Sequence, residues 1–92
     1  MKTERFVKEL ESLIEQLGYQ VRKEKGSFKG DFCVLEGQDM VVLNKSFPSE
    51  FQVGQMARFV LSKNPESLFI KPAVRKELDK YRERIKREVD EQ

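Results

Sequence analysis

The spacing of hydrophobic residues changes along the chain and divides it into helical and extended segments. Between residues 4 and 17 the apolar side chains recur every three or four positions, which places them on one face of a helix. They are Phe6, Val7, Leu10, Leu13, Ile14 and Leu17. We expect Thr3 to cap the start of this helix and Gly18 to end it, because glycine adopts a left-handed conformation without strain.

From Tyr19 the hydrophobic period becomes two, which predicts strands. Residues 19–24 alternate in the way that is typical of an edge strand with one polar side, and residues 25–30 indicate a turn. Two short apolar runs follow at residues 32–35 and 40–43. The simplest arrangement is a meander of three antiparallel strands, and the unbroken apolar character of the last two predicts that both faces of the sheet are at least partly covered.

Two more helices are predicted in the second half of the chain. Ser49 is a suitable N-cap for a helix that continues to about residue 62, before the Asn-Pro pair at residues 64–65. Its expected buried face consists of Phe51, Met56, Ala57, Val60 and Leu61. Residues 68–70 are extended and predict a fourth strand, after which Pro72 begins a long charged helix over residues 72–90.

These elements define the expected fold class and domain organisation. A chain of 92 residues forms one domain by the usual relation of length to domain count. We therefore predict a single α+β domain over residues 1–92, with a three- to four-stranded, mainly antiparallel sheet and packed helices in the order α-β-β-β-α-(β)-α.

Charge and hydropathy narrow the class of protein. Lys and Arg number 18 against 16 Asp and Glu, so the net charge is only +2 and the surface has no dominant sign. No apolar run approaches the ~18 residues that a membrane span requires. The first residues lead into a charged amphipathic segment and not into a signal peptide. The expected protein is cytoplasmic, with no membrane partner.

The near absence of two residue types excludes much catalytic chemistry. The chain has no His, so it contains no Ser-His-Asp triad, no Cys-His pair and no HExxH zinc site. A single Cys allows no internal disulfide and no zinc site built from cysteines. We therefore expect no catalytic residues, no cofactor and no bound metal, and we do not expect an enzyme.

Several single residues have a structural and a functional interpretation. Cys33 lies in a predicted buried strand and is expected to be a packed thiol. The carboxylates of Asp31, Glu36 and Asp39 flank that strand, and solvated turn residues explain them better than a cation site. Asn44 ends a strand, where an amide commonly holds the next loop, with ligand binding as the alternative. Arg58 interrupts an apolar helical run and requires either access to solvent or a carboxylate partner.

A basic segment raises the alternative of nucleic-acid binding. Around Phe28, on the first predicted hairpin, lie Arg22, Lys23, Lys25 and Lys29, and the net charge of residues 22–29 is +3. Basic residues beside an aromatic ring are used to follow a nucleic-acid backbone and stack on its bases. The other interpretation is that lysines on an edge strand prevent aggregation, which the near-neutral charge of the whole chain favours.

The last helix combines basic character with an apolar seam. Residues 71–87 include eight basic and three acidic side chains, which extend the nucleic-acid alternative to this helix. Its seam at Val74, Leu78, Tyr81, Ile85 and Val89 has a spacing close to a heptad. Because the helix is about as long as the domain, we expect its end with Ile85 and Val89 to project. We expect a symmetric dimer that uses this helix, with Tyr81, Ile85 and Val89 as candidate contacts, and whatever sheet face the first two helices leave open.

Parts of the sequence resemble known families. The order helix, three strands, helix resembles a double-stranded RNA-binding domain, although residues 45–51 hold one Lys and one Glu where that family has a Gly- and Lys-rich helix start. Residues 10–78 resemble a group of small bacterial α+β proteins without an assigned activity. The resemblance is carried by residues 17–19 (Leu-Gly-Tyr), Val21 with Arg22, residues 26–30 (Gly-Ser-Phe-Lys-Gly), Cys33 with Leu35 and Gly37, residues 42–45 (Val-Leu-Asn-Lys) and residues 71–75 (Lys-Pro-Ala-Val-Arg).

A strand ending in Asn44 and followed by a helix is also similar to the core of the ImmA/IrrE-type zinc peptidases. That helix carries HExxH in the peptidases, whereas residues 51–56 here contain neither His nor Glu. The resemblance therefore implies a scaffold without the metal. Together, these observations predict a non-enzymatic protein-interaction module that forms a homodimer or binds another protein, with nucleic-acid binding as the alternative.

Overall fold

The computed structural model of the chain describes residues 1–25 and 32–90 and confirms the α+β class. Its helices are α1 (Thr3–Gln16), α2 (Ser49–Ser62) and α3 (Pro72–Asp90), and its strands are β1 (Gln20–Glu24), β2 (Phe32–Leu35) and β3 (Met40–Asn44). Two short 3-10 turns, η1 (Glu36–Gln38) and η2 (Pro65–Ser67), complete the described elements.

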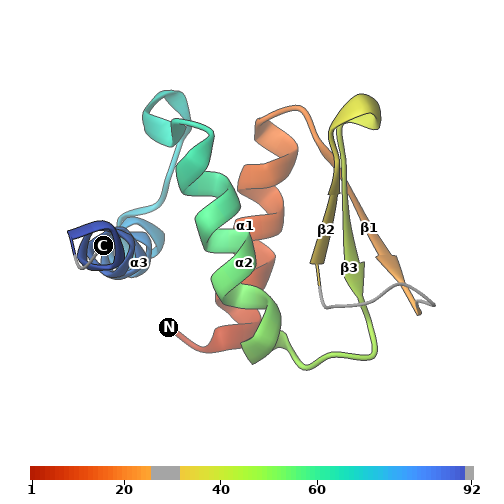
Figure 1. Cartoon of the computed structure of the whole chain (residues 1–92), viewed down its shortest axis with the longest axis horizontal. Helices are drawn as coiled ribbons and strands as arrows, with labels where there is room; N and C mark the ends of the chain where they lie inside the picture. The colour runs from red at the N-terminus through yellow and green to blue at the C-terminus, as the bar shows by residue number, and fades with distance from the viewer. Residues whose placement is uncertain (26–31, 91–92) are drawn as a thin grey trace.

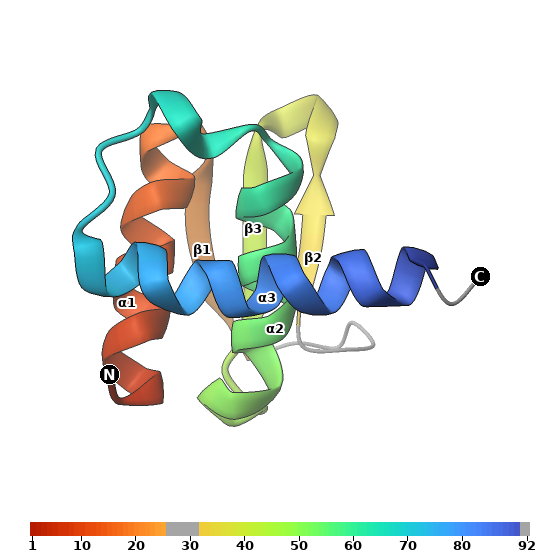
Figure 2. The ribbon, with the colours of Figure 1, turned by 90° about the vertical axis from the view of Figure 1, so that its left-hand side faces the viewer.

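The elements form three layers (Figure 1). The sheet is the first layer, α1 and α2 lie side by side against one of its faces, and α3 packs on the far side of these two helices. Figure 2 shows α3 crossing both helices, with its C-terminal half extending past them. The helix pair is thus enclosed between the sheet and α3.

The strand order corrects the predicted antiparallel meander. β3 lies between β1 and β2, pairing parallel with β1 and antiparallel with β2. β1 and β2 are therefore opposite edges of the sheet and do not form a hairpin with each other. β3, the most apolar strand, lies in the centre of the sheet. The charged β1 lies at an edge, where charged side chains reach solvent on both sides. The predicted fourth strand is absent from the described structure, since residues 68–70 are not part of the sheet.

The core lies mainly between the sheet and the helix pair. The predicted stripe of α1 is buried except for Leu17, which is half-buried. Val41 and Leu43 of β3 are 0% and 2% exposed, because they face α1 and α2. Val74 and Leu78 of α3 are 1% and 2% exposed, which closes the outer side of the helix pair.

Three local predictions are wrong. Thr3 and Ser49 are the first helical residues, so Lys2 and Pro48 occupy the N-cap positions, and neither gives a side-chain cap. Phe51 is 61% exposed, because it lies in the first turn of α2, before the helix meets α1 and α3. By contrast, Gly18 has φ of 95° and ends α1 as expected.

Within the described part of the chain, helices cover one face of the sheet, and the expectation that a second subunit covers the other face stays a prediction. α1, α2 and α3 all lie on the same side of the sheet, because α3 buries its seam on the helix pair and not on the strands (Figure 1). Within residues 1–25 and 32–90, no helix lies on the other face.

Candidate functional site

The uncovered face of the sheet is the principal candidate site. Paired residues of neighbouring strands project on the same side, so Val42 shares this face with Cys33 and Arg22, and Met40 shares it with Leu35 and Gln20. We call the four apolar members, Cys33, Leu35, Met40 and Val42, the open sheet face. All four are only partly exposed and none belongs to the hydrophobic core. The face is apolar in its centre and can bury side chains against a partner.

The β1 side of this face carries a compensated pair of charges. The Nε of Arg22 lies 3.0 Å from Oε1 of Glu24, two residues further along the same side of the strand. Both side chains are about half exposed, so the pair contributes little to stability. It does leave the described part of the face without net charge, which favours an uncharged partner surface over a polyanion.

The residues predicted to bind nucleic acid do not form one basic surface in the described part of the chain. Arg22 pairs with Glu24, and Lys23 projects toward the helices, where its Nζ lies 3.0 Å from Oε1 of Glu11. Lys25 is exposed just after β1. The predicted contacts at Phe28 and Lys29 lie outside the described residues. Arg22 and Lys23 thus project on opposite sides of the sheet and each has a carboxylate neighbour.

The three seam residues predicted for self-association have different environments. The ring of Tyr81 stacks on Phe6 with centroids 6.2 Å apart, so it packs within the chain. Ile85 is half-buried, and Val89 is 66% exposed on the projecting part of α3. Arg58 holds this end of α3 to α2 through Glu88, which confirms the predicted carboxylate partner of Arg58.

A polar cluster joins η1 to the residue before β1 and to the residue after α2. The hydroxyl of Tyr19 donates to Oε2 of Glu36 at 2.6 Å, and Nζ of Lys63 donates to Oε1 at 3.1 Å. The hydrogen bond from Tyr19 and then that from Lys63 lower the pKa of Glu36, while the pKa values of Tyr19 and Lys63 are raised. The Lys63 ammonium also lies 5.5 Å from the ring centroids of Tyr19 and Phe59. The polar groups of Tyr19, Glu36 and Lys63 are paired with one another, so the cluster holds these parts of the chain together.

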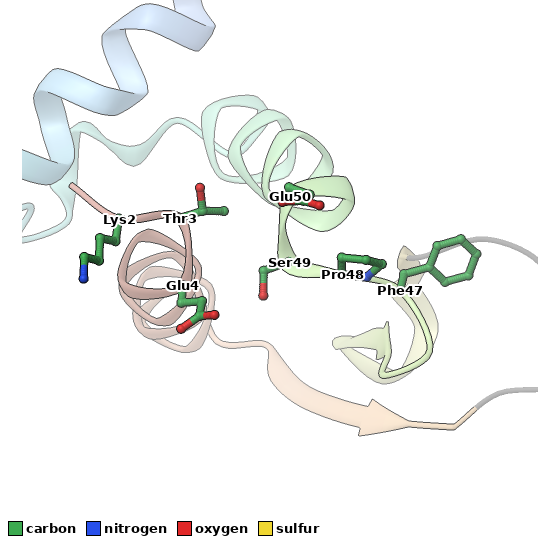
Figure 3. A pocket seen from close by; sticks show the side chains of 7 residues that line it. All are labelled: Lys2, Thr3, Glu4, Phe47, Pro48, Ser49 and Glu50. Atoms are coloured by element: carbon green, nitrogen blue, oxygen red, sulfur yellow. The ribbon is translucent and has the colours of Figure 1, made fainter.

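A pocket of about 580 Å³ lies between the starts of α1 and α2 (Figure 3). Thr3 and Glu4 border it from α1, and Ser49 and Glu50 border it from α2. The acidic side chains in both first turns complement the positive ends of the helices. They also oppose the binding of an anion there, so this pocket is not a phosphate site of the usual kind.

Asn44 behaves as the sequence predicts. It is 2% exposed, its Oδ1 accepts the N–H of Ser46 at 3.0 Å, and its carbonyl accepts Nε2 of Gln52 at 2.6 Å. The amide therefore holds the loop between β3 and α2. Gln52 was not expected in the core, because a glutamine beside Phe51 gives no apolar signal.

Residues 1–25 and 32–90 contain no group of three Cys, Asp or Glu side chains placed to hold a metal ion. Asp31, one of the three turn carboxylates, lies outside them, and Glu36 is engaged in the Tyr19 cluster. Within the same residues, no helix combines the length and the apolar character needed to cross a membrane.

Comparison with known proteins adds no relative: no family model, no curated protein and no solved structure matches the chain.

Proposed function

We propose that the chain is a non-enzymatic protein-interaction domain that forms a symmetric dimer through the open sheet face. The observation that supports this most directly is the layer order: α3 packs on the helix pair, and within residues 1–25 and 32–90 no helix lies over the four partly exposed apolar residues on the other side of the sheet. The resemblance of residues 10–78 to small bacterial proteins supports a bacterial setting for this domain.

A second copy is the occupant that fits this face best. In a two-fold stack with the axis across the strands, Met40 of one copy meets Val42 of the other, and Leu35 meets Cys33. Arg22 then faces Gln20 of the second copy, so no like charges meet. A surface of this kind is complementary to itself, as a two-fold interface requires. The pairing also removes the apolar face from water, which is the driving force.

The size of the face sets the expected affinity. Three strands about 4.8 Å apart, with up to five residues each of about 3.3 Å, give a footprint of roughly 15 Å by 15 Å. This is well below the ~800 Å² per partner of a standard stable interface. We therefore expect a weak dimer that forms at high protein concentration.

The exposed end of α3 is the second surface considered for self-association. It lies on the far side of the helix pair from the open sheet face, so one two-fold contact cannot use both (Figure 1). Tyr81 is engaged with Phe6, which leaves two apolar residues there: Ile85, which is half-buried like the residues of the open sheet face, and the exposed Val89. The sheet offers four apolar residues, and we therefore assign the dimer contact to it.

Sedimentation equilibrium over ten to several hundred micromolar tests the proposal. The wild-type chain is expected to shift from monomer to dimer over this range. Met40→Lys, at the end of β3, introduces a charge into the stacked faces and is expected to keep the chain monomeric. Phe69→Lys is the matched control, because Phe69 is 78% exposed and lies on a loop away from the sheet.

Circular dichroism and urea unfolding establish that each variant is folded. If Met40→Lys is unfolded, Leu35→Lys at the β2 edge provides the same test. A wild-type chain that stays monomeric at every concentration, or a folded Met40→Lys or Leu35→Lys variant that dimerises like the wild type, contradicts the proposal. Loss of the dimer in Phe69→Lys as well also contradicts it, because the contact then lies elsewhere.

A further inference from the structure

A groove of about 440 Å³ lies where α3 crosses the C-terminal half of α2. Its position is on the side of the molecule opposite the open sheet face, at the crossing that Figure 2 presents to the viewer. The groove is lined by Arg58, Leu61, Ser62, Glu66, Arg82 and Ile85. These residues come from α2, η2 and α3, so the site exists only in the folded chain.

The groove combines an apolar floor with two guanidinium groups. Leu61 and Ile85 are half-buried and leave part of their side chains to the groove. Its volume corresponds to about fifteen water molecules at ~30 Å³ each, which is at the small end of the ~300–1,000 Å³ of ligand pockets. A short apolar chain fits this space, whereas a folded partner does not enter it.

The two arginines are held differently. Arg58 donates two hydrogen bonds to Glu88, at 3.0 and 2.6 Å, and is therefore occupied. Arg82 has only one carboxylate neighbour in the described structure, with its Nη2 3.6 Å from Oε1 of Glu66, too long for a hydrogen bond. Its side chain is 50% exposed and that of Glu66 is 60% exposed, so this contact is easily exchanged.

We propose that the groove binds a medium-chain fatty carboxylate, with the chain on Leu61 and Ile85 and the carboxylate on Arg82. The planar guanidinium of Arg82 presents a fork of N–H donors that fits one carboxylate through two hydrogen bonds. Glu66 already places a carboxylate near this guanidinium, and the carboxylate of the ligand replaces that of Glu66 at a distance shorter than 3.6 Å. Since only one arginine is available, a monoanion fits better than a phosphate dianion.

The proposal predicts opposite effects for two neighbouring residues. Removing Arg82 removes the carboxylate's partner, so Arg82→Gln is expected to weaken binding about tenfold, as for the loss of a charge-assisted hydrogen bond. Removing the charge of Glu66 frees Arg82 and reduces repulsion, so Glu66→Gln is expected to tighten binding. A residue that serves only the fold would not give this opposite pair of effects.

Titration of the folded protein with decanoate, followed by the NMR methyl signals of Leu61 and Ile85, tests the site. Saturable shifts are expected with decanoate, much weaker ones with decanol, and none with acetate, which has the carboxylate without the chain. Lys76→Gln is the matched control, because Lys76 is an exposed cation on the same helix outside the groove. It is expected to bind as the wild type does.

Several outcomes overturn the proposal. They are shifts that do not saturate, decanol binding as tightly as decanoate, and Arg82→Gln binding like the wild type. A ligand that moves the signals of Met40 and Val42 in place of those of the groove also overturns it. Because the groove and the open sheet face lie on opposite sides, this test and the dimer test can fail independently.

Discussion

The guanidinium of Arg58 on α2 donates two hydrogen bonds to the carboxylate of Glu88 on α3, at 3.0 and 2.6 Å. The two residues are thirty positions apart in the sequence. Their pairing lowers the pKa of Glu88 and raises that of Arg58, in each case mainly through the hydrogen bonds between them. It fastens the part of α3 that extends past the helix pair.

This pair predicts an acid-sensitive end of α3. The pKa of Glu88 in the folded chain is lowered from its ordinary 4.5. The contact between Arg58 and Glu88 therefore stabilises the folded state above pH 4.5, and this stabilisation is lost as the pH falls through the pKa of folded Glu88. Hydrogen exchange is expected to show full protection of the last two turns of α3 at pH 6 and reduced protection near pH 3. Glu88→Gln should show the reduced protection at both pH values.

Glu83→Gln is the matched control for this prediction. Glu83 is an exposed carboxylate on the same helix, and no ion pair holds it within the described residues. Its replacement should preserve the acid response of the wild type. An equal effect of both variants would show that the general charge of α3, and not the contact with Arg58, protects the end of the helix.

Two glycines are expected to respond oppositely to alanine. Gly54 lies inside α2, and an added Cβ would meet Cε1 of Tyr81 at 4.0 Å, an ordinary contact. Gly54→Ala should therefore stabilise the fold by roughly 0.5–1 kcal/mol, the usual gain inside a helix. Gly18 has φ of 95°, so Gly18→Ala should cost about 1–2 kcal/mol despite open space around it. Urea unfolding of the two variants decides this, and a shift in the same direction for both would contradict it.

Two phenylalanines on α2 should differ strongly in their contribution to stability. Phe59 is 8% exposed, and its ring meets those of Tyr19 and Phe32 with centroids 5.0 and 5.9 Å apart. Phe59→Ala is expected to cost about 3–5 kcal/mol, because it leaves a cavity between α2 and the sheet. Phe51 is 61% exposed, and Phe51→Ala should stay within about 0.5 kcal/mol of the wild type. Thermal unfolding measures both, and similar losses would show that Phe51 is buried in solution.

The helices could be predicted because each buries a continuous stripe, and this pattern depends only on local spacing. The stripe of α1 and the inner residues Val74 and Leu78 of α3 are buried as their spacing indicates. Leu17 is an exception, since the chain turns away at Gly18. Phe51 is a second exception, because the hydrophobic pattern does not show at which residue of α2 the contacts with α1 and α3 begin.

The strand order could not be predicted in the same way. The charges of β1 indicate that it is an edge strand, but they do not show whether its neighbour is β2 or β3. The short connection between β1 and β2 favours a hairpin of these two strands. β3 lies between them, which also determines which residues form the open sheet face. The apolar runs of β2 and β3 indicate burial on two sides, yet the helices of residues 1–25 and 32–90 lie on one side only. The hydrophobic pattern shows which side chains require burial, but it does not show which part of the molecule buries them.

Gln52, like Val53 and Phe59, is a buried residue of α2 that the predicted face did not include, and its contact can be tested. Its Nε2 donates to the carbonyl of Asn44 at 2.6 Å, across the loop that joins β3 to α2. The same carbonyl also accepts the N–H of Phe47 at 3.1 Å, so it retains one donor when the side chain is replaced. We therefore expect Gln52→Leu to cost about 1 kcal/mol, near the lower end for a buried hydrogen bond.

Gln55→Leu is the control, because Gln55 lies three residues later on the same helix and is exposed. Its replacement changes helix propensity and polarity in the same way without removing this contact, so its free energy of unfolding should remain within about 0.5 kcal/mol of the wild type. The N–H of Phe47 should stay protected in hydrogen exchange in both variants, since its bond to the Asn44 carbonyl at 3.1 Å does not involve the Gln52 side chain. Equal stability of the two variants would show that the loop is held by Asn44 alone.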